Sequence, residues 1–173
     1  MDLRPYDPGR PGDPAALWDC KRRFELELGT GTGDDDKRAQ YEGKLDDAYR
    51  ERYLDWAARC VADEPRAITV AALPESACAA PPSFAGYVFV LPERLAMIWD
   101  AAVLNEVFVR EAHRGSGVAD DLLDAAVAVA RDQDLPLDRL VLDVDRGNDR
   151  ARAFYRRHGF THWGEMVARE LPP

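Results

Sequence analysis

A short turn between two apolar segments contains residue types that bind phosphate. Residues Arg114–Ala119 follow a β-rich segment at 107–109 and precede a segment with helical periodicity. The backbone N–H groups of such a turn point outward, the helix dipole adds partial positive charge, and Arg114 adds a full charge. Gly115 and Gly117 lack the side chains that would keep a ligand away from the backbone. The pattern predicts an anion-binding turn, and a strand-to-helix turn without a ligand is the alternative.

The spacing of these glycines excludes two common phosphate motifs. The dinucleotide-binding fingerprint needs a third glycine in the pattern G-x-G-x-x-G, and Asp120 stands at that place. The Walker P-loop ends in G-K-[ST], and this region has no lysine. The turn therefore suits a phosphate ligand of another kind.

The chain is acidic, with a formal net charge of −9 over 173 residues. Affinity for nucleic acid comes mainly from basic groups, so we expect no nucleic-acid partner. Negative charge weakly favours a cationic, amine-bearing substrate. The length suits one sizeable core, and we expect a single domain over residues 1–173.

The cysteines and histidines form no pattern typical of a metal site. Cys20, Cys60 and Cys78 are odd in number and lack the spacing of metal ligands, and the three histidines do not cluster with them. We expect neither a disulfide framework nor a bound metal. No signal peptide is visible, and no run approaches the ~20 apolar residues of a membrane helix. We therefore expect a cytoplasmic protein without a membrane partner.

The N-terminal part reads as a strand and two helices. A strand over residues 1–7 precedes a helix that begins at the N-cap Asp13 and ends near Leu28, before the glycine-rich stretch 29–33. A second helix is expected over about 34–62. Its aromatic and apolar residues recur at helical spacing, which favours core contact, with a substrate groove as the alternative. These residues are Tyr41, Leu45, Tyr49, Tyr53, Trp56 and Cys60.

The remaining segments alternate between strand and helix patterns. Residues 66–73 and 83–91 read as an antiparallel hairpin with a long loop, and a strand is expected within 95–109, most clearly from Ala102. Helix 116–133 follows, then strand 140–144, a helix capped by Asn148, and two short strands within 160–171. The element order predicts an α/β protein.

Two motifs, in order, resemble those of the GNAT acetyltransferase superfamily. Residues Asn148–Phe160 match the pattern N-x-x-A-x-x-F-Y-x-x-x-G-F, and Arg114–Ala119 resembles the Q/R-x-x-G-x-G/A pyrophosphate loop. The resemblance covers roughly residues 98–171. It implies a GNAT-like fold: a mixed, mostly antiparallel central sheet with splayed strands and about four flanking helices.

The resemblance also implies a set of coenzyme-binding residues. The strand at 107–109 would splay and pair with the pantetheine arm, the amide of Val107 would polarise the thioester carbonyl, and Arg110 would add charge at the rim. Asn148 would contact the pantetheine arm or only cap its helix. The expected coenzyme-binding residues are Val107, Phe108, Val109, Arg114, Gly115, Ser116, Gly117, Val118, Ala119, Asn148 and Tyr155.

Two residues are implied in proton transfer. Tyr155 matches the family's frequent general acid, which protonates the departing thiolate; a tyrosine packed beside Phe154 is the alternative. Glu106 matches a position where many relatives carry an acidic residue that takes the amine proton, directly or through water. A solvent-facing strand carboxylate is the alternative for Glu106.

The implied activity is an acetyl-CoA-dependent N-acetyltransferase that acts on a primary amine, with a small molecule as the leading acceptor class. Direct transfer in a ternary complex is favoured, because none of the cysteines lies in either motif. The alternatives are acetylation of a protein N-terminus or lysine, and a non-catalytic acyl-CoA-binding or sensing module. The family also suggests a homodimer.

Overall fold

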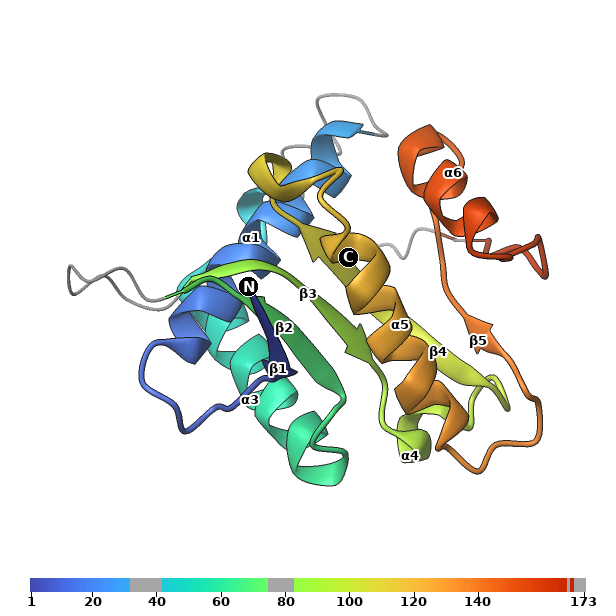
Figure 1. The fold of residues 1–173 in the computed structure, drawn as a ribbon, viewed down its shortest axis with the longest axis horizontal. Coiled ribbons are helices and arrows are strands. Elements are labelled where there is room, and N and C mark those ends of the chain that lie inside the picture. Colours follow the sequence, from blue (N-terminus) through green and yellow to red (C-terminus); the bar gives the residue numbers. More distant parts are fainter. Residues whose placement is uncertain (32–41, 75–82, 168, 170–173) are drawn as a thin grey trace. The chain divides into compact units, whose positions relative to one another are not determined.

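The computed structural model describes residues 1–31, 42–74, 83–167 and 169. The chain forms two compact units, Met1–Asp143 and Val144–Pro173. Among the described residues, the first unit has a five-stranded sheet and the helices α1, α3, α4 and α5, and the second unit has helix α6 (Figure 1). The elements are β1 (Asp2–Pro5), α1 (Asp13–Gly31), α3 (Asp47–Asp63), β2 (Ile68–Ala72), β3 (Phe84–Val90), α4 (Glu93–Ala96), β4 (Ala102–Val109), the 3-10 helix η1 (Glu111–His113), α5 (Val118–Arg131), β5 (Leu140–Val141) and α6 (Asp149–Arg157).

The sheet is mixed and mostly antiparallel, as predicted. Its strand order is β1-β2-β3-β4-β5, with antiparallel pairing from β1 to β4 and parallel pairing between β4 and β5. The β4–β5 ladder has only two pairs, Ala102 with Leu140 and Val103 with Val141. Among the described residues, the part of β4 beyond Val103 has ladder pairs with β3 alone.

A β-bulge interrupts the pairing of β3 with β4. Phe89 pairs with Glu106 and Val90 with Leu104, which leaves Asn105 as the extra residue. A bulge bends its strand and redirects the neighbouring side chains. Glu106 is therefore buried, although Asn105 is exposed.

Helices cover both faces of the sheet. Tyr87 and Phe89 of β3 join a core cluster with residues of α1 and α3, and the alternation of a strand sends Val88 and Val90 to the other face. On that face α5 packs against β2, β3 and β4, burying a helical stripe that includes Leu122. All seven residues of β3 are buried, as expected for a strand covered on both sides (Figure 1).

The two N-terminal helices differ from their predicted bounds. Helix α1 continues through Gly29 to Gly31, because a glycine costs only about 1 kcal/mol in a helix and does not by itself end one. Helix α3 begins at Asp47 rather than near residue 34, since the side chain of Asp46 caps it by accepting from the amide of Tyr49. Residues 34–41, with Tyr41, lie outside the described residues.

Asp13 has a different role from the predicted N-cap. Its two carboxylate oxygens each lie 2.7 Å from a guanidinium nitrogen of Arg4, and one accepts from the amide of Asp7. The carboxylate therefore joins the start of α1 to β1. The core role predicted for the stripe of α3 is confirmed for Tyr53 and Cys60, which are buried.

The strand expected within 95–109 is confirmed as β4, which spans the predicted Ala102–Val109 and follows the short helix α4. The strands predicted near the C-terminal end are wrong. The two strands expected within 160–171 do not form in the described residues 160–167 and 169. Apolar residues there, such as Val167, are exposed and have no neighbouring strand to pair with.

Candidate active site

The glycine turn adopts the left-handed backbone that its sequence suggests. Gly115 has a φ of +76° and Gly117 a φ of +91°, and Gly117 is the N-cap of α5. Such angles are strained for residues with a Cβ. A Cβ at either position would meet no atom within 4 Å. The backbone conformation, rather than crowding by the protein, therefore requires glycine here.

The amides of the turn are available to a ligand. Within the described part of the chain, the N–H groups of residues 115–119 have no hydrogen-bond acceptor. The first carbonyl bonds of α5 run from Asp120 and Asp121 to Gly117. A row of unpaired N–H groups at the start of a 14-residue helix can accept an anion such as a pyrophosphate.

Two arginines near the turn are held by α1. One Nη of Arg114 lies 2.5 and 2.6 Å from the two carboxylate oxygens of Glu27, and its Nε donates to the Val109 carbonyl. Arg110 pairs with Asp19 at 2.6 Å and donates to the Phe84 carbonyl. Both guanidinium groups therefore brace the turn against α1, a role that the sequence did not suggest.

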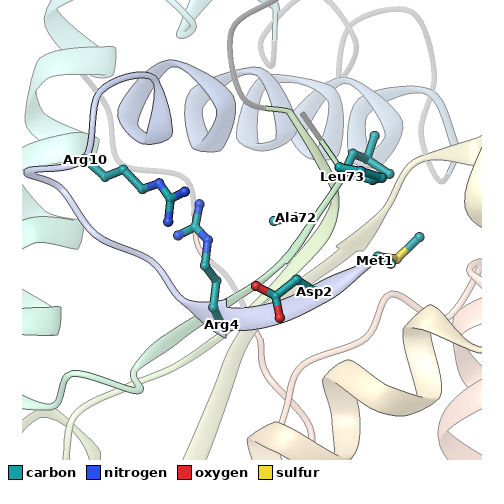
Figure 2. A pocket seen from close by; sticks show the side chains of 7 residues that line it. Met1, Asp2, Arg4, Arg10, Ala72 and Leu73 are labelled. Carbon is teal, nitrogen blue, oxygen red and sulfur yellow. The ribbon is translucent and has the colours of Figure 1, made fainter. Parts of the chain in front are cut away.

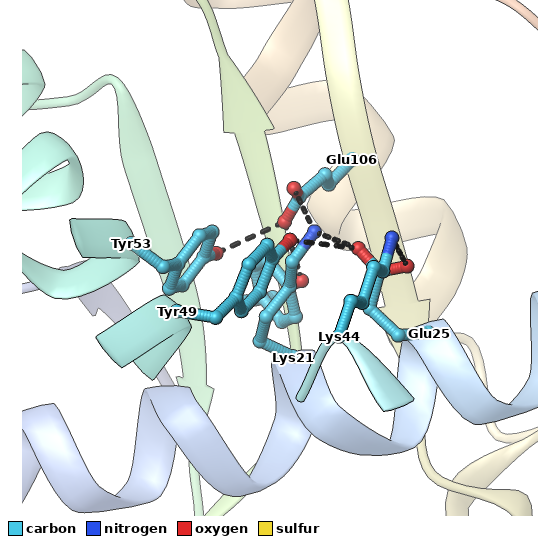
Figure 3. A network of polar contacts seen from close by, with 7 residues as sticks. Lys21, Glu25, Lys44, Tyr49, Tyr53 and Glu106 are labelled. Atoms are coloured by element: carbon cyan, nitrogen blue, oxygen red, sulfur yellow. Dashed lines mark hydrogen bonds and ion pairs between the residues drawn. The ribbon is translucent and has the colours of Figure 1, made fainter. Parts of the chain in front are cut away.

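Glu106 occupies a buried polar network on the α1 and α3 face of the sheet (Figure 3). The residue is only 6% exposed, which excludes the solvent-facing alternative. Its Oε1 accepts from Lys21 Nζ at 2.5 Å. Its Oε2 accepts from the hydroxyls of Tyr53 at 2.9 Å and Tyr87 at 2.6 Å. Both carboxylate oxygens are thus hydrogen-bonded.

The network continues from Lys21 toward the surface. Lys21 Nζ also lies 2.6 Å from Glu25 Oε1, and Lys44 Nζ lies 2.7 Å from Glu25 Oε2. The Tyr49 hydroxyl donates to Glu25 Oε1 at 3.3 Å. Lys21 and Glu25 are each 4% exposed, whereas Lys44 is at the surface. Two lysines therefore balance the two buried carboxylates (Figure 3).

The network shifts the ionisation of its own donors. Burial lowers the pKa of Lys21, but attraction to Glu106 and Glu25 outweighs it, so the pKa is raised. Burial, aided by the charge of Glu106, raises the pKa of Tyr53 and of Tyr87 well above the usual value. All three donors therefore keep their protons at neutral pH.

The second unit contains the other two predicted site residues. The Asn148 side chain accepts from the amide of Ala151 at 3.0 Å and so caps α6, as one of the two interpretations predicted. Tyr155 packs edge-on against Phe154 and against Phe160, with ring centroids 5.4 and 5.5 Å apart. Burial raises the pKa of Tyr155 to about 12, so its hydroxyl keeps its proton at neutral pH.

The sequence did not assign four members of this network to the site: Lys21, Glu25, Tyr53 and Tyr87. A signal for Lys21 was nevertheless present. It lies on the same helical side as Leu17 and Phe24, and only three of the 23 basic residues are lysines. A charged residue on the apolar side of a helix, with Glu25 four positions later, indicates a buried ion pair.

Other features of the first unit lie apart from this network. A hollow of about 430 Å³ beside β1 is lined by residues that include Met1, Asp2, Arg4 and Arg10, at the sheet edge opposite β5 (Figure 2).

The described residues contain no group of three metal-binding side chains. No described helix has a window long and apolar enough to cross a membrane. Burial raises the pKa of the Cys20 and Cys60 thiols to about 11, and Cys78 lies outside the described residues.

Solved structures share this fold at low sequence identity. The PaiA N-acetyltransferase from Thermoplasma acidophilum, in complex with coenzyme A, has a TM-score of 0.66 and 16% identity over 92% of this chain and 89% of that chain. The NatC complex bound to Gag peptide and CoA has a TM-score of 0.61 and 16% identity over 95% and 87%. The ribosomal-protein-alanine N-acetyltransferase from Brucella melitensis biovar Abortus 2308 has a TM-score of 0.53 and 18% identity over 98% of each chain.

The sequence itself identifies the family. No curated protein matches the chain in sequence. The family model of the acetyltransferase (GNAT) family matches residues 33–160, which is more than half of the 173 residues. This match spans the glycine turn, the splayed strand β4 and the motif on α6. The chain belongs to the GNAT family of acetyltransferases.

Proposed function

We propose that the chain is an acetyl-CoA-dependent N-acetyltransferase that transfers the acyl group directly to a primary amine of a small molecule. The observation that carries this proposal is the row of unpaired amides at residues 115–119, which follows the part of β4 whose ladder pairs, among the described residues, are with β3 alone. An anion can bind at the row of amides, and an extended ligand can pair with backbone groups of β4. A diphosphate joined to an extended arm is the chemistry of coenzyme A.

The residues present fit the coenzyme. The amides of Gly115, Ser116, Gly117, Val118 and Ala119 would hold the pyrophosphate, with Arg114 supporting the turn from behind. Val107, Phe108 and Val109 would pair with the pantetheine arm, and Asn148 would contact the same arm while capping α6. The open space around Gly115 and Gly117 supports this assignment, because no side chain fills it.

Proton transfer is assigned to two side chains of opposite state. Glu106 is a carboxylate that accepts hydrogen bonds and would take the amine proton through water, since little of it is exposed. Tyr155 carries a proton and would donate it to the departing sulfur. Its pKa, raised to about 12 by burial, supports the acid role because the hydroxyl is protonated at neutral pH.

A protein acceptor is the second candidate. It is favoured by two structures of the same fold, one named as a ribosomal-protein-alanine N-acetyltransferase and one bound to a Gag peptide. Acetylation of a protein N-terminus or lysine would use the same coenzyme residues. A non-catalytic acyl-CoA-binding module is the third candidate.

We further propose that residues 1–173 act as one domain, in the cytoplasm, and that the protein is a homodimer.

The test is a thiol-release screen with acetyl-CoA and a panel of amines. The panel contains aminoglycosides, polyamines, amino-acid derivatives and peptides with free N-termini. We expect thiol release with a small amine. Double-reciprocal plots of the rate should give intersecting lines when the concentrations of both substrates are varied. Release with peptides alone supports the protein alternative, and coenzyme binding without release from any acceptor supports the sensing module. Parallel lines would contradict direct transfer.

A further inference from the structure

The ammonium of Lys21 lies at the centre of the buried network. It is shared between Glu106 on β4 and Glu25 on its own helix, at 2.5 and 2.6 Å. It also lies 4.9 Å from the centre of the Tyr53 ring and 5.1 Å from that of Phe24, distances at which aromatic faces attract a cation. One lysine therefore joins α1, α3 and β4.

Glu106 is held by groups from three separate elements. Lys21 of α1 occupies Oε1, while Tyr53 of α3 and Tyr87 of β3 occupy Oε2 (Figure 3). The residue lies between the bulge at Asn105 and Val107, the residue assigned to the thioester carbonyl. Both oxygens of the carboxylate are thus hydrogen-bonded, which fixes its orientation.

Stability alone does not explain this arrangement. Buried ion pairs contribute little net stability, because desolvation offsets the attraction between the charges. Apolar side chains of similar volume would fill the same space between α1 and the sheet. A function for the charge is the remaining explanation.

We propose that Lys21 is the positioning residue of the transfer reaction, and that its ammonium, through its contact with Oε1, holds the Glu106 carboxylate in the orientation in which it accepts the amine proton. This inference rests on the proposed function, in which Glu106 accepts the amine proton. The other groups that face the network are Glu25 of α1, Tyr49 and Tyr53 of α3, Tyr87 of β3, and Lys44, which precedes α3.

Two substitutions in the network should act in opposite directions. Lys21→Gln keeps a donor but removes the positive charge, so Glu106 binds a proton more readily. Glu25→Gln removes the second carboxylate that shares Lys21, so the ammonium acts on Glu106 alone and Glu106 binds a proton less readily. A purely structural role for Lys21 would not produce opposite shifts.

The experiment measures kcat/KM against pH with saturating acetyl-CoA, together with thermal unfolding of each variant. We expect the acidic side of the kcat/KM profile of Lys21→Gln, its low-pH limb, to shift to higher pH by roughly one pH unit or more, as for a lost charge partner. The low-pH limb of Glu25→Gln should shift to lower pH. Lys21→Arg should restore the wild-type limb, because it restores the charge. Arg23→Met, which breaks an exposed pair with Asp19 on the same helix, is the control and should change nothing.

The outcomes separate two failures. The positioning role of Lys21 is overturned if the wild-type protein is active but the low-pH side of the kcat/KM profile is unmoved in both variants, or moves in the same direction in both. If Lys21→Gln does not fold, the downward shift of Glu25→Gln decides the question alone. A wild-type protein that releases no thiol with any amine overturns the proposed function itself.

Discussion

Gly117 combines two requirements at one residue. Its φ of +91° is strained for any residue with a Cβ, and its amide belongs to the unpaired row at the start of α5. Gly117→Val should weaken coenzyme A binding by roughly tenfold or more, because backbone strain of about 1–3 kcal/mol distorts the turn. Calorimetric titration with coenzyme A checks this. Gly164→Val, at an open position with an ordinary φ, is the matched control; equal affinity in all three proteins would refute the loop assignment.

Tyr155 is the residue assigned to protonate the leaving thiolate. Tyr155→Phe retains the ring contacts with Phe154 and Phe160 and removes only the hydroxyl. We expect turnover to fall by about 10²-fold or more, the usual effect of losing a general acid, while coenzyme affinity changes little. Single-turnover kinetics and calorimetry separate the two quantities. Turnover within twofold of the wild type would remove Tyr155 from the mechanism.

At the residue scale, the sequence predicted the turn but not the surroundings of Glu106. The positive φ values follow from local chemistry, because two glycines in a short turn permit them. The contacts of Glu106 join residues 19 to 85 positions away along the chain. No local pattern encodes such contacts, because they depend on how α1 and α3 pack on the sheet.

Strands β3 and β4 approach closely at Gly86, which pairs with Val109. A Cβ at Gly86 would lie 2.3 Å from the Phe108 carbonyl oxygen and 3.1 Å from Val109 Cα. Gly86→Ala should therefore destabilise the fold by about 1–3 kcal/mol, the usual cost of overpacking, and should weaken coenzyme binding by shifting β4. Urea unfolding measures the loss.

Gly43→Ala is the control for this substitution, since a Cβ there would meet nothing within 4 Å. We expect its free energy of unfolding to stay within about 0.5 kcal/mol of the wild type. If Gly86→Ala were as stable as Gly43→Ala, the close approach of the two strands would be wrong.

At the element scale, types were predicted better than bounds. The hairpin of β2 and β3 and the helix α5 follow from period-two and period-3.6 patterns. The patterns did not predict that α3 begins only at Asp47. The apolar spacing continues across the interruption before α3, and only the cap at Asp46 marks the start of the helix. Strands expected after Phe160 failed for a different reason: a strand needs a partner, which apolar composition alone does not supply.

For the whole molecule, the buried network makes stability depend on alkaline pH. The pKa values of Lys21, Tyr53 and Tyr87 are all raised in the folded protein above ordinary values of 10.5, 10.0 and 10.0. A raised pKa contributes stability that is complete below the unfolded value and is lost as pH rises toward the folded value. The free energy of unfolding should therefore fall above about pH 10, by up to about 1.4 kcal/mol per pH unit for each proton involved, and the melting temperature should fall with it.

Tyr87→Phe provides the comparison for this dependence. It removes one of the groups whose pKa is raised by folding, so its melting temperature should fall less steeply above about pH 10 than that of the wild type. Circular dichroism melts at a series of pH values measure both slopes. Identical slopes would show that Tyr87 does not titrate as a buried donor to Glu106.

The two motifs of the family lie in different units of the chain. The glycine turn belongs to Met1–Asp143, and the helix with Asn148 and Tyr155 belongs to Val144–Pro173. The sequence predicted both motifs and the order of elements that carries them, because each is local. For the acceptor it offered only the weak preference of an acidic chain for a cationic amine, since acceptor contacts depend on side chains brought together from several elements.

We propose that this GNAT family member uses acetyl-CoA as its acyl donor. The most direct measurement is calorimetric titration of acetyl-CoA into the full chain, followed by thiol release in the same sample after an amine is added. We predict one saturable site per chain and release that depends on both the amine and the coenzyme. Absence of saturable binding at millimolar acetyl-CoA would contradict the account.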